Sequence, residues 1–273
     1  PAGNESASSS ALSVEVDTSV AATGIALAND AGASGSDQIT RDGEVAVTLA
    51  SDVESWEYSV DAGNSWNAGS GTSFTLSAGS YADGEVQARQ TDVAGNLSSA
   101  GTISGAITVD ETTPSVTSLT RVNATPTNAD SLSWDVTFSE AVANVDATDF
   151  RVANTTATLS VSNEGSNTYR VTASGGDLAD LEDTITLSFF GGHNIIDTAG
   201  NALAGAPAVS GTDEPSYLVD NAPPAVTQAS VPSDQTYSLS AAARVLRFQL
   251  SMSEAVTVAS GTPRVPFTMQ SGT

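Results

Sequence analysis

Cysteine and lysine are both absent from the 273-residue chain, and histidine occurs once, at His193. Without cysteine the chain forms no disulfide bonds, so its folded units depend on a good core or on another cross-link. The chain lacks the partner residues that this histidine would need in a zinc site or a catalytic triad. The sequence therefore predicts that the protein is not an enzyme.

Long apolar runs are also missing. No segment approaches the roughly 18 consecutive apolar residues that a membrane-crossing helix needs. We therefore expect no membrane span in this segment.

Basic residues are scarce. The chain has 32 aspartates and glutamates against 8 arginines, which gives a formal net charge of −24. Such a chain repels the phosphates of nucleic acids and anionic lipid surfaces, so no nucleic-acid partner is expected. Clustered carboxylates attract hard divalent cations such as Ca²⁺. The same acidity is also typical of a solvated surface that keeps an extracellular protein soluble, and both interpretations stay open.

One stretch organises the rest of the sequence. Asp92-Val93-Ala94-Gly95-Asn96 is an acidic glycine turn, residues 102–109 are apolar and β-prone, and residues 110–114 form an acidic joint that ends in proline. The same order recurs at residues 197–224 and, in part, at residues 2–18. We interpret the stretch as the last hairpin of a β module, its final strand and the hinge to the next module.

The repeats divide the chain into modules. Residues 1–17 are expected to be the closing strand of a preceding module. Module one is expected at 18–111, module two at 112–221 and a partial module three at 222–273. Each complete window has the usual length of a single domain with a modest core.

Strand signals dominate both complete modules. Between Ser131 and Phe138 the apolar residues alternate strictly with polar ones, which predicts one buried face and one wet face. Residues 56–60 and 66 flank an Asp-Ala-Gly-Asn turn, as in a hairpin. Tyr81 precedes a strand as in a tyrosine corner. Short strands at regular spacing predict an all-β chain of Ig-like β-sandwich modules in an extended tandem array.

Module three repeats the pattern of module two. Leu246, Phe248, Leu250 and Met252 alternate as Leu132, Trp134, Val136 and Phe138 do, and residues 253–256 repeat Ser139-Glu140-Ala141-Val142. The offset is 253 − 139 = 114 throughout. The match in pattern and phase indicates duplication.

The segments 56–66, 84–96, 136–150 and 196–201 resemble the bacterial Ig-like repeats of giant RTX-type and biofilm-associated surface adhesins. The resemblance covers nearly the whole chain. It implies a secreted cell-surface stalk, often rigidified by calcium at the module joints. No glycine-rich RTX nonapeptide array is present, and Asp-Glu-Thr-Thr-Pro replaces the more usual Asp-Thr-Thr-x-Pro.

The acidic joints are the candidate metal sites, because calcium takes 6–8 oxygen ligands. The candidates are Asp92, Asp110 and Glu111 at the first joint, and Asp197, Asp220 and Asn221 at the second. Asp30, Asp37 and Asp42 are candidates for a site inside module one, and Asp146 with Asp149 and Glu140 with Glu254 are further ones. Aspartate and asparagine are also common turn residues, so a site without metal stays open.

The leading functional hypothesis is a structural stalk of a large bacterial surface adhesin or filament, located outside the cell, with calcium-rigidified joints. Its expected partners are the neighbouring modules of the same chain. An alternative is an Ig-like module that binds a glycan or another surface protein, since Trp56, Trp66 and Trp134 are able to stack on sugars. A second alternative is a non-catalytic spacer of a large secreted enzyme.

Overall fold

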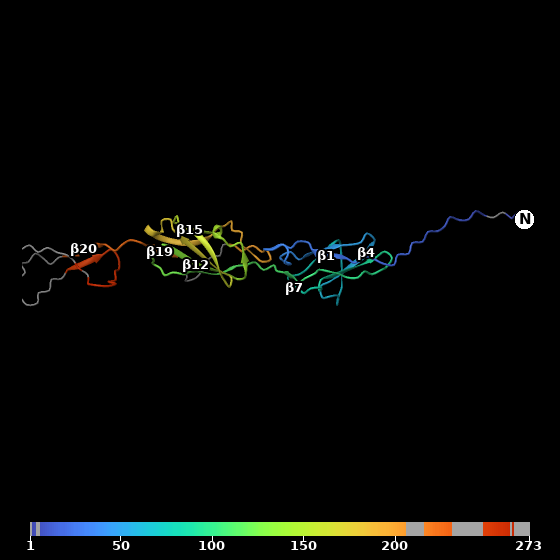
Figure 1. Cartoon of the computed structure of the whole chain (residues 1–273), viewed down its shortest axis with the longest axis horizontal. Helices are drawn as coiled ribbons and strands as arrows, with labels where there is room; N and C mark the ends of the chain where they lie inside the picture. The colour runs from blue at the N-terminus through green and yellow to red at the C-terminus, as the bar shows by residue number, and fades with distance from the viewer. Residues whose placement is uncertain (1, 4–5, 206–215, 231–247, 263, 265–273) are drawn as a thin grey trace, which may run out of the picture.

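The computed structural model describes residues 2–3, 6–205, 216–230, 248–262 and 264. Its regular elements are β-strands and two short 3-10 turns, and the described residues contain no α-helix. The expected all-β class is therefore confirmed. Figure 1 shows the strands of module one, those of module two and the hairpin that contains β20 as separate groups along the ribbon.

Module one contains three small sheets. Their strand orders are β1-β3-β6, β5-β4-β8-β9 and β2-β10-β7. The strands are β1 (Gly24–Leu27), β2 (Ile39–Thr40), β3 (Glu44–Thr48), β4 (Val53–Ser59), β5 (Asn67–Ala68), β6 (Ser73–Thr75), β7 (Gly79–Tyr81), β8 (Gln87–Asp92), β9 (Gly101–Thr102) and β10 (Ile107–Val109).

The core of module one draws side chains from all three sheets. Val45 of β3, Trp56 of β4 and Ile107 of β10 belong to one buried cluster. Because each strand alternates its side chains between two faces, this arrangement places the sheets as layers around a shared apolar interior.

Module two has one long sheet and two shorter ones. Their orders are β11-β12-β16-β15, β14-β17-β19 and β13-β18. The strands are β11 (Val116–Arg121), β12 (Ser131–Phe138), β13 (Val142–Ala143), β14 (Phe150–Val152), β15 (Thr158–Gly165), β16 (Thr168–Ser174), β17 (Glu182–Phe189), β18 (Ile196–Asp197) and β19 (Ser216–Asp220). The 3-10 turns are η1 (Ala147–Asp149) and η2 (Leu178–Asp180).

Strand β12 has the two faces that its alternation predicts. Leu132, Trp134 and Val136 are 0% exposed and Phe138 is 2% exposed. They pack in one cluster with Ile185 of β17 and residues of β14 and β19, so the two larger sheets face each other across the core. This packing is consistent with a β-sandwich.

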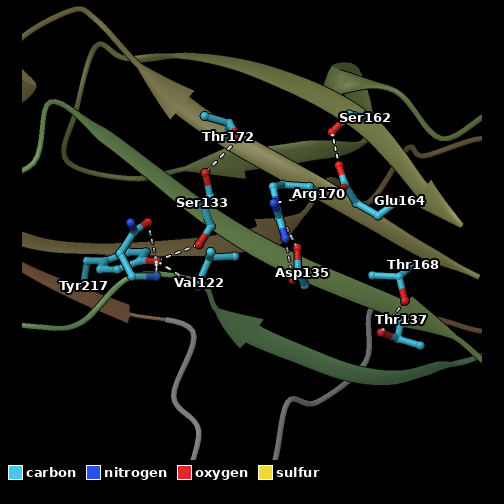
Figure 2. Close-up of polar contacts among 11 residues, drawn as sticks. Val122, Ser133, Asp135, Thr137, Ser162, Glu164, Thr168, Arg170, Thr172 and Tyr217 are labelled. Carbon is cyan, nitrogen blue, oxygen red and sulfur yellow. Dashed lines mark hydrogen bonds and ion pairs between the residues drawn. The ribbon is translucent and has the colours of Figure 1, made fainter.

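The opposite face of β12 is polar. Figure 2 shows Ser133 beside Thr172, Asp135 beside Arg170, and Thr137 beside Thr168. Arg170 donates from Nε to Asp135 Oδ1 at 2.8 Å and from a terminal nitrogen to Oδ2 at 3.0 Å. These cross-strand pairs stabilise the register between β12 and β16.

The described part of module three is one hairpin. Strand β20 (Val226–Ser230) pairs with β21 (Gln249–Met252), with a register shift between Val226 and Gln228. Strands β11 and β12 have a corresponding shift between Val116 and Ser118. Phe248 and Leu250 are each 39% exposed, and Leu246 lies outside the described residues.

The two candidate corner tyrosines differ. Tyr81 donates its hydroxyl to the carbonyl of Ser77 at 2.9 Å, four residues upstream. Tyr217 is fully buried in module two, and its ring meets Trp134 edge to face at 5.1 Å between centroids. The sequence interpretation selected only Tyr81, although Tyr217 makes the larger set of backbone contacts.

Candidate metal centres at the module joints

Two groups of three carboxylates lie in the described part of the chain, one beside the segment that leads into module one and one between the strands of modules one and two. The first consists of Asp17, Asp52 and Asp92, and the second of Asp110, Glu140 and Asp197. Within each group the carboxylate oxygens lie within 4.8 Å of one another. We call these groups joint cluster one and joint cluster two.

Joint cluster two takes its ligands from both modules. Asp110 follows β10 of module one, while Glu140 follows β12 and Asp197 ends β18 in module two. The backbone amide of Asp110 donates to the carbonyl of Thr40 at 2.9 Å, and its Oδ1 accepts from the amide of Thr112 at 2.9 Å. These bonds fix the direction of the linker that leaves module one.

The glycine turn after Asp197 holds its carboxylate in place. Asp197 Oδ1 accepts from the amide of Asn201 at 2.8 Å, and Oδ2 accepts from the Asn201 side chain at 2.8 Å. The side-chain nitrogen Nδ2 of Asn201 also donates to the backbone carbonyl of Asp110 at 2.7 Å. Asn201 therefore connects the turn of module two to the residue that directly follows β10 of module one.

Joint cluster one has the same construction. Asp92 accepts from the Asn96 amide at 2.8 Å and from the Asn96 side chain at 2.9 Å. Asp17 accepts from the amide of Ser19 at 3.2 Å, as Asp110 accepts from Thr112. Asp52 immediately precedes Val53, which pairs with Asp92.

The third acid of joint cluster two also precedes a paired valine. Glu140 lies two residues before Val142, and Val142 pairs with Asp197. Both clusters are therefore built from a linker aspartate, a turn aspartate and an acid just before the strand that pairs with the turn.

The electrostatics of the clusters favour a cation. Burial, together with the charges of Asp197 and Asp110, raises the pKa of Glu140. Burial also acts to raise the pKa of Asp92, but hydrogen bonds from Asn96 and from the amides of Ala94 and Gly95 lower it overall. Three carboxylates at this spacing offer the hard oxygen donors that calcium accepts in flexible geometry.

The structure groups the predicted joint residues differently from the sequence interpretation. Asp92 was expected beside Asp110 and Glu111, but it lies in joint cluster one and Asp110 lies in joint cluster two. The segment 97–109 separates them, and about 13 extended residues span up to roughly 43 Å. Strand β10 also belongs to a different sheet from β8, so it is not the second arm of a hairpin with the glycine turn.

The second expected group, Asp197 with Asp220 and Asn221, is also separated. Asp197 belongs to joint cluster two, while Asn221 donates to the carbonyls of Leu178 at 2.7 Å and Leu181 at 3.1 Å. Asp220 accepts from the amide of Ala222 at 3.2 Å, as the linker aspartates of the two clusters do with their neighbours. Glu111 is exposed and belongs to neither cluster.

The linker after Asp220 repeats the earlier joint. Ser253 Oγ accepts from the amide of Ala225 at 2.9 Å, and Ser139 Oγ accepts from that of Ser115 at 3.0 Å. Glu254 therefore follows a serine in the same local arrangement as Glu140 does.

The loop acids of module one do not form a group of three among the described residues. Each instead accepts a backbone amide of its own loop: Asp30 from Gln38 at 3.0 Å, Asp37 from Ile39 at 3.1 Å and Asp42 from Glu44 at 3.1 Å. The loop that contains them lies against the glycine turn of module two, because Ala33 donates to the carbonyl of Thr198 at 3.1 Å.

Asp146 and Asp149 cap the 3-10 turn η1. Asp146 accepts from the Thr148 amide at 2.7 Å, and Asp149 accepts from the Asp146 amide at 2.8 Å. The hydrogen bond from the Thr148 hydroxyl and, to a lesser extent, the one from the Thr148 amide lower the pKa of Asp146. This reciprocal capping accounts for both residues without a metal.

Two residues of joint cluster one were missed from the sequence. Asp17 and Asp52 were not proposed, and Glu140 was only a secondary candidate. The signal for Asp17 was present, because it occupies the same place before its linker as Asp110 and Asp220 do. The sequence around Asp52 does not resemble that around Glu140. Asp52 is followed directly by Val53, whereas Ala141 separates Glu140 from Val142.

The tryptophans offer little open ring surface. Trp134 is 0% and Trp56 is 6% exposed. Trp66 is half-buried, and the guanidinium of Arg89 lies 3.8 Å from its ring centroid. Stacking on a sugar therefore has less structural support than the carboxylate clusters have.

Among the described residues, no helix combines the length and the apolar character that crossing a membrane requires. A comparison of the chain with protein-family models gives no match, and a comparison with curated proteins gives no significant match.

Proposed function

We propose that this chain is a structural stalk segment of a large secreted bacterial surface adhesin. In this proposal its Ig-like β-sandwich modules form an extended tandem array, and calcium rigidifies their joints. The protein lies outside the cell and has no catalytic role. The observation that carries the proposal is the recurrence of one carboxylate construction at two successive joints.

A repeated site suits a repeated mechanical task better than a single active site. Joint cluster two includes Asp110 from one module and Asp197 from the next, so a bound ion would tie the two together. Without a cation, two carboxylates 4 Å apart repel each other by about 1 kcal/mol even in bulk water. An ion of charge +2 reverses the sign of this interaction.

Calcium titration of the full chain tests the proposal. An ion that binds only the folded form stabilises it by about 2.7 kcal/mol when its concentration is 100 times Kd. For a module of about 100 residues this corresponds to a rise in Tm of roughly 10 °C or more. Small-angle scattering should show a larger maximum dimension with calcium than with chelator.

The matched variants keep the loss of charge constant. Asp110→Asn with Glu140→Gln removes two carboxylates from joint cluster two and should abolish most of the calcium response of module two. Glu111→Gln with Glu182→Gln removes two exposed carboxylates outside the cluster and should leave the response intact. Equal Tm and equal maximum dimension with and without calcium in the natural chain would falsify the calcium hypothesis.

A further inference from the structure

The glycine turn of module two is covered by module one. Three consecutive carbonyl oxygens of the turn accept hydrogen bonds from the loop between β1 and β3. Thr198 accepts from the Ala33 amide at 3.1 Å and Ala199 from the Arg41 amide at 3.0 Å. Gly200 accepts from the Arg41 guanidinium at 2.9 Å.

The contact depends on small residues. A Cβ on Gly32 would overlap the carbonyl oxygen of Thr198. A Cβ on Gly200, which has a φ of +94°, would lie 3.1 Å from the Cα of Gly32. Ala199 is 0% exposed as a result of this approach. The loop and the turn therefore fit by backbone proximity, which a larger side chain at either position disrupts.

Module one has the same turn without a cover. The Asp92–Asn96 bonds match those between Asp197 and Asn201, and Gly95 has a φ of +87°. Ala94 is nevertheless exposed, and Val93 before it is 72% exposed. Within the described residues, the carbonyl oxygens of residues 93–95 accept no hydrogen bond.

We infer that the turn Val93-Ala94-Gly95 is a docking site for a loop of the type that residues 29–42 form, supplied by a module that precedes module one. The inference rests on the proposed function, because it takes the modules as units of a tandem array. The occupant must supply a glycine like Gly32, two free backbone amides and an arginine like Arg41. A second copy of module one has all of these.

Charge also favours this occupant. The turn adjoins the three carboxylates of joint cluster one, and the chain carries only 8 basic residues against 32 acidic ones. An arginine in the position of Arg41 would place one of these rare cations next to the acidic joint. Arg41 itself lies in this way beside joint cluster two, where its guanidinium donates to the carbonyl of Gly200.

The test inserts a second copy of residues 18–110 before Thr18 of the full chain, so that its Asp110 takes the place of Asp17. The natural chain has no cysteine, so spin labels can be introduced at chosen sites. Exposed Ala46→Cys in both copies of module one reports on the new joint. Ala46→Cys with Ser160→Cys in the natural chain reports on the existing one. Pulsed dipolar spectroscopy then measures each distance distribution, with chelator and with calcium.

With chelator, we expect the distribution at the new joint to be as narrow as at the existing joint. Gly32→Ala in the inserted copy should broaden it at least twofold, while Gly35→Ala, whose Cβ meets nothing closer than 3.7 Å, should not. Arg41→Gln in the inserted copy, which adds no bulk, should broaden it partly. Circular dichroism checks that every variant keeps its sheet content.

A new joint that is broad with Gly32 intact, or equally narrow with Gly32→Ala, overturns the inference. The calcium arm separates this result from failure of the proposed function. If both joints are narrow and calcium changes neither, docking stands and the calcium hypothesis fails. If only the existing joint narrows with calcium, the proposed function stands and docking at residues 93–95 fails.

Discussion

Tyr217 donates its phenolic hydrogen to the backbone carbonyl of Ser133, with 2.6 Å between the two oxygens. The same hydroxyl accepts from the amides of Val122 at 3.1 Å and Asn123 at 2.9 Å. Figure 2 shows Tyr217 reaching the backbone of β12 beside Val122. One buried side chain thus joins β19 to the end of β11 and to β12, across the two sheets of module two.

Tyr217→Phe should therefore destabilise module two. The change removes the hydroxyl to which the Asn123 amide donates, while the Val122 amide and the Ser133 carbonyl keep their bond to each other at 2.9 Å. A polar group that loses its partner in this way costs about 1–3 kcal/mol. We therefore expect a loss of about 1–3 kcal/mol in the free energy of unfolding. Chemical denaturation measures it. Tyr81→Phe, which removes a single bond to Ser77 at the surface, is the control and should cost less than about 1 kcal/mol.

Trp134→Ala should be the most damaging single truncation in module two. Its side chain is fully buried among both sheets, and replacing such a residue with alanine costs about 3–5 kcal/mol. Hydrogen exchange of the amides of β16 measures the opening free energy without a fluorescent probe. Trp66→Ala in module one should leave these amides unchanged. A loss below about 1 kcal/mol at β16 would show that Trp134 is not the centre of this core.

The hydrogen bonds of Asp61 predict how the stability of module one changes at acidic pH. Hydrogen bonds from the Ser65 hydroxyl, the Ser65 amide and the Ser59 hydroxyl lower its pKa from 3.8 to about 2. Because the folded pKa lies below the unfolded one, the carboxylate stabilises the fold fully above pH 3.8 and loses this effect as the pH falls through 2.

The comparison of the natural chain with Asp61→Asn measures this effect. The difference in Tm should be constant above about pH 5 and should shrink toward pH 2. An NMR titration of the Asp61 carboxyl carbon gives the pKa directly. A midpoint at 3.8, the ordinary value, would contradict the hydrogen-bonded geometry.

The sequence predicted the local elements well, because periodicity is a local signal. The expected strand at 131–138 coincides with β12. Alternation also identified the buried face, as the exposure of Leu132, Trp134 and Val136 confirms.

The sequence did not predict which joint residues meet. Their place in one stretch of turn, strand and joint suggested that Asp92 and Asp110 share a site, yet the chain runs through β9 and β10 between them. Which end of a module a turn occupies depends on the order of the strands in the sheets, and a single sequence does not state that order. Asp52 was missed for the same reason, since only the pairing of Val53 with Asp92 places it beside the turn.

The path of the chain through module two has a mechanical consequence. The linker from module one enters through β11 and the linker to module three leaves through β19, and Figure 1 shows β19 at the side that faces β20. Strand β19 pairs antiparallel with β17 over residues 216–220, and β11 pairs antiparallel with β12. Hydrogen bonds in such ladders lie perpendicular to the strands. Tension between the two linkers would pull each strand lengthwise along its partner, so the bonds of a ladder share the load in shear and do not open one after another.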